Sequence, residues 1–303
     1  MTLTSQNQSA VPAPARPATA GAPRPVPSGR LAQIRTFHPR RGRLSARHLD
    51  ALDRLWPRYG LTVPPELTSV GSTGSNPGNT GTAPGNARTS AEDAGTGQAG
   101  SVSSGAGWLD LVELFGRRAP VVLEIGSGMG DATVAMAAAD PSRDYLAVEV
   151  HTPGIANLLA LTEQHGLTNV RIAQGDALDL VRHLLLPDRL DAVHVFFPDP
   201  WPKPRHHKRR LVQPAHVALL RSRLVTGGIL HCATDWPEYA ESMRDTLTAD
   251  PELENVFPGY APRPAHRPVT KFERRGTAAG RPILDLVFRR YRKPVAGPDD
   301  RPA

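Results

Sequence analysis

The chain has 303 residues, 39% of them apolar, and a net charge of +7 from 36 Lys and Arg against 29 Asp and Glu. This size suits one α/β domain with extensions, and the basic excess favours a polyanionic partner such as nucleic acid over ordinary surface charge. The chain has a single cysteine, Cys232, which excludes an internal disulfide and a metal site built from thiolates. It has no apolar run long enough for a membrane span or a signal peptide. We therefore expect a cytoplasmic protein.

Composition divides the chain into five parts. Residues 1–29, rich in Ala, Pro, Ser and Thr, predict a disordered tail. Residues 30–66 combine arginines with helically spaced apolar side chains and predict an ordered basic extension. Residues 67–107 have the Gly/Ser/Thr composition of a flexible linker or insertion, residues 108–293 form the predicted catalytic domain, and 294–303 form a second tail.

Strand and helix patterns alternate from residue 108 onward, which predicts a mostly parallel sheet with helices on both faces. Five of the expected strands are residues 121–125, 145–150, 170–174, 192–197 and 229–234. Two further segments, 271–274 and 283–291, are expected to close the sheet as an antiparallel pair, which makes seven strands. The expected helices are residues 132–139, 153–165, 177–186 and 214–224, and one that begins after Asp235 as its N-cap.

A glycine loop follows the first of these strands and precedes a helix. Its glycines are Gly126, Gly128 and Gly130, a pattern that lets the backbone turn tightly and approach a ligand. A dinucleotide fingerprint needs its third glycine where Asp131 stands, so that interpretation fails by one residue. The loop therefore predicts a nucleotide-like ligand of a different kind.

Carboxylates end the strands around this loop. Glu124 would repel phosphate but attract the ammonium and sulfonium groups of S-adenosylmethionine; a helix-capping glutamate is the alternative. Glu149 suits ribose hydroxyls, or is a solvated strand-end group. Asp176, with the backbone of Ala177, suits adenine; Asp176 could equally cap the next helix, and both roles can hold together.

The segment after the fourth strand is the most informative in the chain. Asp199 lies between Pro198 and Pro200, and a run of cations follows, so a fixed backbone is joined to a surface for a polyanion. Trp201 either stacks on a base or packs within the loop. The cations expected to bind phosphates are Lys203, Arg205, Lys208, Arg209 and Arg210, with Arg40, Arg41 and Arg43 of the extension.

Three motifs carry a resemblance to a known family: Leu-Glu-Ile-Gly-Ser-Gly-Met-Gly, Val-Glu-Val-His-Thr-Pro-Gly and Phe-Phe-Pro-Asp-Pro-Trp-Pro-Lys with its basic continuation. Together they resemble the bacterial tRNA (guanine-N7-)-methyltransferases, and only the low-complexity segments and the tail fall outside the resemblance. It implies a Rossmann-like class I methyltransferase fold. It also implies methyl transfer from S-adenosyl-L-methionine to N7 of a guanosine in tRNA, at position 46 of the variable loop.

The same resemblance implies the roles of individual residues. Asp199 would be catalytic and would also contact the cofactor. The other cofactor-binding residues would be Glu124, Gly126, Gly128, Gly130, Glu149, Asp176 and Ala177, and the substrate-binding residues Lys203, Asp235, Thr270, Lys271, Phe272 and Glu273. The expected partner is tRNA, with no membrane and no obligate protein partner. The long insertion leaves open how the basic extension reaches the active site.

Guanine N7 offers an in-plane lone pair and carries no proton, so the reaction needs positioning more than a strong base. Asp199 is therefore expected to act by position and charge. Methylation of another RNA or of an amine is one alternative, and a non-catalytic RNA-binding protein is another. The histidines, including His151, His194, His206 and His207, show no metal-ligand spacing, so no metal is expected.

Overall fold

A computed structural model describes residues 35–37, 42–64 and 107–291 of the chain. Both predicted tails, almost all of the predicted linker, and the candidate residues Arg40 and Arg41 lie outside the described residues. Within the described part, no helix combines the length and apolar character needed to cross a membrane.

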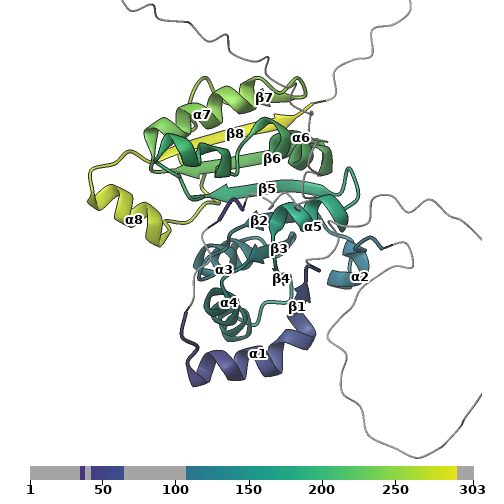
Figure 1. Ribbon diagram of the computed structural model, residues 1–303. Helices are drawn as coiled ribbons and strands as arrows, with labels where there is room; N and C mark the ends of the chain where they lie inside the picture. The colour runs from purple at the N-terminus through teal and green to yellow at the C-terminus, as the bar shows by residue number, and fades with distance from the viewer. Residues whose placement is uncertain (1–34, 38–41, 65–106, 292–303) are drawn as a thin grey trace, which may run out of the picture. The chain divides into compact units, whose positions relative to one another are not determined.

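One sheet of eight strands organises the part of the chain that the structure describes (Figure 1). Its strand order is β1-β4-β3-β2-β5-β6-β8-β7. Neighbours from β1 through to β6 are parallel, whereas β8 runs antiparallel to both β6 and β7. The strands are β1 (Gly60–Thr62), β2 (Val121–Ile125), β3 (Asp144–Glu149), β4 (Val170–Gln174), β5 (Leu190–Phe196), β6 (Leu224–Thr234), β7 (Leu253–Asn255) and β8 (Leu284–Arg290).

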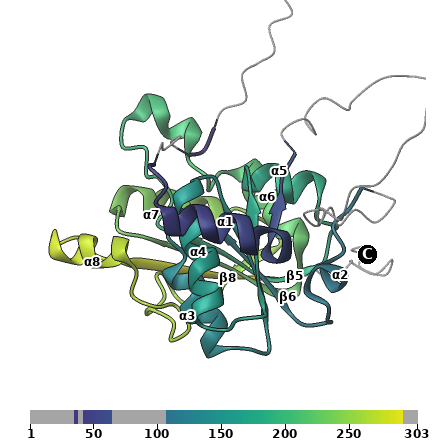
Figure 2. The same cartoon turned by 90° about the horizontal axis from the view of Figure 1, so that it is seen from below.

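Helices cover both faces of this sheet, as the alternating pattern predicted. The buried side chains of α1 (Ala46–Tyr59), α3 (Asp131–Ala139) and α4 (Thr152–Gln164) form one core cluster. A second cluster holds those of α2 (Leu111–Phe115), α5 (Ala177–His183), α6 (Pro214–Arg223) and α7 (Pro237–Thr248). Figure 2 shows α1 lying across α4. The central strands, buried on both sides, are near-continuous apolar runs for this reason.

The sheet has one strand more than the seven predicted, and β1 of the basic extension is a strand that the prediction missed. It pairs in parallel with β4 at the sheet edge, and the pairing continues where the Val63 N–H donates to the Gln174 carbonyl at 2.9 Å. Three residues are too few to show a period in the sequence. The partner strand alone defines this segment as β.

The predicted strand at 271–274 is wrong, because these residues begin helix α8 (Lys271–Ala278). The Thr270 side chain caps that helix by accepting from the Glu273 N–H at 3.1 Å, which outweighs the weak strand pattern. The edge strand that pairs with β8 is β7 instead. The C-terminal antiparallel arrangement was thus correct, but one of its members was not.

Asp235 was also assigned the wrong local role. Helix α7 has Trp236 at its N-cap position and starts at Pro237. The Asp235 carboxylate instead accepts two hydrogen bonds from the Arg281 guanidinium, at 2.9 and 2.7 Å. This contact ties the end of β6 to the segment that enters β8, so Asp235 positions two elements and does not cap α7.

The strand order reverses at β2. From β2 the sheet grows through β3 and β4 on one side and through β5 and β6 on the other. Neighbouring crossover connections therefore diverge at the carboxyl ends of β2 and β5, and a crevice opens there, which is where open α/β sheets bind ligands. Topology alone thus locates the candidate site.

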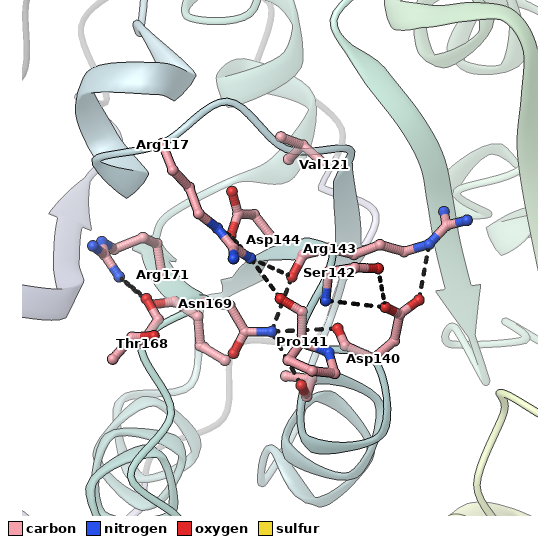
Figure 3. A network of polar contacts seen from close by, with 12 residues as sticks. Arg117, Val121, Asp140, Pro141, Ser142, Arg143, Asp144, Thr168, Asn169 and Arg171 are labelled. Atoms are coloured by element: carbon pink, nitrogen blue, oxygen red, sulfur yellow. Dashed lines mark hydrogen bonds and ion pairs between the residues drawn. The ribbon is translucent and has the colours of Figure 1, made fainter.

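A polar network lies at the amino-terminal ends of the strands, at the edge of the sheet opposite the candidate site (Figure 3). Buried Asn169 donates to the carbonyls of Ala137 and Arg143 at 3.0 and 2.9 Å. Arg117 bridges the buried Asp144 carboxylate and the Pro141 carbonyl, at 2.7 and 2.9 Å. These contacts join the end of α3 to the starts of β3 and β4, and Asn169 satisfies the buried Ala137 carbonyl.

We predict that Asn169→Ala lowers the free energy of unfolding by about 1–3 kcal/mol, because the carbonyls of Ala137 and Arg143 lose their buried donor. Urea unfolding at constant pH measures the change. Asn255→Ala is the matched control, since its amide bonds the Gly259 carbonyl in an exposed turn. Equal losses in the two variants would contradict a specific role for the network.

Candidate active site

A pocket lies at the carboxyl ends of β2, β3, β4 and β5, where the topology places a crevice. It brings together most of the residues predicted from the sequence to hold a cofactor, and it adds residues of the basic extension. The lining residues are Thr36, Phe37, Ile125, Gly126, Gly128, Val148, Glu149, Val150, His151, Gly175, Asp176, Ala177, Phe196, Phe197, Pro198, Asp199, Leu211 and Phe272.

The glycine loop forms one wall of the pocket. Gly126, Gly128 and Gly130 all have positive φ, at 79°, 60° and 86°, a backbone region in which other residues are strained. Gly126 and Gly128 line the pocket, whereas Gly130 begins α3. A Cβ at Gly130 would lie 2.6 Å from Leu158, so this third glycine permits helix packing and does not line the pocket.

The Glu149 carboxylate fixes the loop to the end of β3. Its Oε2 accepts from the Gly128 N–H at 2.7 Å, and its Oε1 accepts from Val150 and His151 at 2.7 and 2.8 Å. Each carboxylate oxygen has two lone pairs, so Oε1 is fully used and Oε2 keeps one acceptor position. The residue expected to bind ribose thus has a second role, which is to hold the backbone that surrounds the ligand.

Glu124 lies behind this wall and is not among the lining residues. Its side chain is 3% exposed, and its Oε2 accepts from the Thr133 hydroxyl at 2.5 Å. Burial raises the pKa of Glu124 to about 7, against the opposing effect of the Thr133 hydrogen bond. The structure therefore does not place Glu124 with the other expected cofactor residues on the pocket surface.

The sequence left two roles open for Asp176, helix capping and contact with a ligand. Asp176 caps α5 by accepting from the Leu178 N–H at 2.9 Å, and it lines the pocket together with Ala177. Burial raises its pKa above the ordinary range. The capping role is confirmed, and the position is compatible with a ligand contact.

Asp199 lies at the opposite wall, in a backbone turn that carries unusual strain. Phe197 and Trp201 on either side have positive φ, at 51° and 46°. Each such residue costs on the order of 1 kcal/mol, and such strain persists where surrounding contacts fix the chain. The turn therefore holds the Asp199 carboxylate at a defined place in the pocket.

Two side chains fasten this turn. Arg210 is 4% exposed; its guanidinium donates to the Pro200 carbonyl at 2.9 Å and to Glu238 at 3.0 Å. Trp201 is 3% exposed and donates to the Thr36 carbonyl at 3.2 Å. Trp201 is thus a packed loop aromatic, and Arg210, expected at the phosphate surface, is instead a buried brace of the Asp199 turn.

The remaining cations of the segment do face outward. Lys203, Arg205 and Lys208 are exposed, while Arg209 lies over the Trp201 ring at 4.9 Å. Arg43 in the described part of the extension is also exposed. These five side chains keep the surface position that phosphate contacts require.

The expected substrate residues at 270–273 divide between surface and core. Thr270 caps α8, and Lys271 is exposed. Phe272 is partly exposed, lines the pocket and stacks on Phe197 with ring centroids 6.3 Å apart. Glu273 is buried, and its Oε2 accepts from Arg267 at 2.5 Å. Of these four, Phe272 alone reaches the pocket.

Among the residues that sequence reasoning missed, three shape the site. Thr36 and Phe37 line the pocket from the basic extension, and no local pattern indicates that they reach it. Gly154 is the third: a Cβ there would lie 2.0 Å from the Gly128 carbonyl, so only glycine lets α4 begin against the loop. The motif Val-Glu-Val-His-Thr-Pro-Gly contains Gly154, and this motif was the available signal.

Comparisons with known proteins identify relatives of this chain. A family model described as "Putative methyltransferase" matches residues 118–286. A tRNA (guanine-N(7)-)-methyltransferase of Streptomyces avermitilis is 50% identical over 260 residues, covering 85% of this chain and 76% of that protein. One of Streptomyces coelicolor is 47% identical, covering 85% and 81%. Among solved structures, an rRNA methylase from Streptococcus thermophilus shares 13% identity and a TM-score of 0.40, over 57% of this chain and 88% of that one.

The raised pKa of Glu124 predicts a pH-dependent loss of stability. The pKa of Glu124 in the folded state, about 7, exceeds its ordinary value of 4.5. The contribution of this carboxyl to folding stability is therefore complete below pH 4.5 and is lost as pH rises through 7. Glu124→Gln should therefore gain on the order of 3 kcal/mol relative to wild type between pH 4.5 and 8. Urea unfolding at both pH values measures this difference. Exposed Glu241→Gln is the control, and parallel pH profiles for wild type and Glu124→Gln would refute the assignment.

Proposed function

The chain belongs to the tRNA (guanine-N(7)-)-methyltransferase family, and we propose that the pocket at the ends of β2 to β5 is its active site. The family activity is transfer of the methyl group of S-adenosyl-L-methionine to N7 of a guanosine in tRNA. The observation that carries the site assignment is the convergence of the glycine loop, Glu149, Asp176 and Asp199 on one pocket.

We assign the cofactor to the wall formed by the glycine loop, β3 and β4. The free acceptor position on Glu149 Oε2 suits a ribose hydroxyl, and Gly126 and Gly128 let the ligand approach the backbone. Asp176 and the Ala177 backbone suit the amine and ring nitrogen of adenine. Buried Glu124 acts through Thr133 and the start of α3, as a positioning residue behind the loop.

We assign the guanine to the Asp199 side of the pocket. The stacked rings of Phe197 and Phe272 offer an apolar wall for a planar base. Attack by N7 needs no proton removal, but it moves positive charge from the sulfonium to the purine. A carboxylate fixed beside that ring stabilises the developing charge, which is the role we give Asp199.

We place the tRNA backbone over the exposed cations beside the pocket. Lys203, Arg205 and Lys208 are exposed and follow the Asp199 turn in the chain, and Arg43 is an exposed cation of the extension. Such contacts position the RNA without reading its sequence. The variable loop is the part of the tRNA that we propose to enter the pocket, and the cytoplasm is the compartment we propose.

We predict that Asp199→Asn lowers kcat by roughly 10²–10³-fold, because the isosteric amide keeps the turn but removes the charge that faces the purine. The measurement is transfer of a labelled methyl group to unmodified tRNA, followed by nucleoside analysis. Asp245→Asn, an exposed change on α7, is the control. Labelled N7-methylguanosine at the wild-type rate would remove Asp199 from the mechanism, and a different labelled nucleoside would overturn the substrate.

We predict that Arg205→Gln with Lys208→Gln makes tRNA binding less salt-dependent. Each lost phosphate contact lowers the slope of log K against log salt by about 0.7–0.9, so the double variant should lose roughly 1.5. The slope comes from the tRNA binding constant measured at a series of salt concentrations. Arg118→Gln, exposed near the start of β2 and hence at the opposite edge of the sheet, is the matched control. An unchanged slope in the double variant would exclude both residues from the RNA surface.

A further inference from the structure

Three histidines from distant parts of the chain meet beside β5 and β6. His194 lies on β5, His231 lies on β6, and His266 lies in the segment between β7 and α8. One ring nitrogen from each lies within 4.8 Å of the other two. The sequence analysis expected no metal because it sought ligand spacing along the chain, and these positions are too far apart in sequence to show it.

The three rings form a nearly equilateral triangle. Their centroids are 5.7 Å apart for His194 and His231, 5.5 Å for His194 and His266, and 5.4 Å for His231 and His266. The His194 and His266 rings are nearly parallel, with 17° between their planes, and the His231 ring stands at 81° to both. The distance between His231 Nδ1 and His266 Nε2, 3.3 Å, is that expected for two nitrogens on one tetrahedral ion.

A second shell orients one of these rings. His231 Nε2 lies 2.7 Å from Asp285 Oδ1, and Arg267 donates to both oxygens of that carboxylate, at 2.7 and 2.8 Å. With its proton on Nε2 toward Asp285, His231 directs the Nδ1 lone pair at His266. A carboxylate–histidine pair that fixes the tautomer in this way is a regular feature of metal sites.

His194 supplies an independent observation. It is buried, and its Nδ1 atom has no hydrogen-bond partner among the described residues. An unpaired buried nitrogen is costly, and a bound ion removes that cost.

We propose that His194, His231 and His266 bind one divalent transition-metal ion of the zinc type. Three imidazole ligands suit Zn²⁺, and the exposed side of His266 leaves the fourth position to water. The ion connects β5, β6 and the segment that leads into α8. The His194 and His231 rings also pack on Phe196 with centroids 4.9 Å away, so the ion stiffens the wall of the pocket from behind.

The test uses full-length untagged protein, stripped with a chelator and titrated with Zn²⁺ alone in competition with a chromophoric chelator. We expect one equivalent of Zn²⁺ per chain, a rise in Tm on loading, and visible absorption bands when Co²⁺ replaces Zn²⁺. His266→Gln should bind at least about 100-fold more weakly, since even second-shell losses cost ~10–100-fold. Because His266 is exposed, this variant should still unfold cooperatively without metal, and its Tm should not rise on addition of Zn²⁺.

His165→Gln, another exposed histidine that lies outside the cluster, is the matched control and should bind like wild type. The proposal is overturned if stripped wild-type protein takes up no Zn²⁺ at micromolar concentrations, which would leave a simple His231–His266 hydrogen bond. It is equally overturned if His266→Gln binds Zn²⁺ as tightly as wild type does. Both outcomes are read from metal binding and Tm, so they do not depend on methyl transfer.

Discussion

The parallel pairing of β1 to β6 is the constraint on which the rest of the structure depends. Parallel strands all end at the same edge, so Glu149, Asp176 and Asp199 meet there although long stretches of chain separate them. The reversal of strand order at β2 opens the crevice between them. At the opposite edge the Asp144 carboxylate is paired with Arg117 and Asn169 binds backbone carbonyls, so that edge serves stability.

The pocket is completed by the basic extension. Strand β1 extends the sheet beside β4, and the Val63 Cβ lies 2.5 Å from where a Cβ at Gly175 would stand. Thr36 and Phe37 enter the pocket, and the Thr36 carbonyl accepts from the Trp201 indole. The described part of the extension therefore contributes to the proposed active site, which it reaches through the contact of Thr36 with Trp201.

The buried cations around the pocket have a different role from the exposed ones. Arg210 and Arg267 are buried and hydrogen-bonded to carboxylates and, for Arg210, to a carbonyl, so they fix the Asp199 turn and the start of α8. Lys203, Arg205 and Lys208 remain in solvent, where positive charge is available to a polyanion. A buried cation that lost its partners would cost several kcal/mol, which explains why the two kinds are not interchangeable.

The sequence by itself determined the α/β class, the glycine loop and the Asp199 turn, and it offered the Asp176 cap as one of two roles, because each depends on residues adjacent in the chain. Local propensity gave a wrong prediction at 271–274, where the Thr270 cap stabilises a helix. It also missed β1, which is a strand only because it pairs with β4. Tertiary structure alone decided that Glu124 and Arg210 are buried and that Thr36 reaches the pocket. It also gathered His194, His231 and His266. Burial and long-range contact depend on how distant segments pack, and no local pattern records that packing.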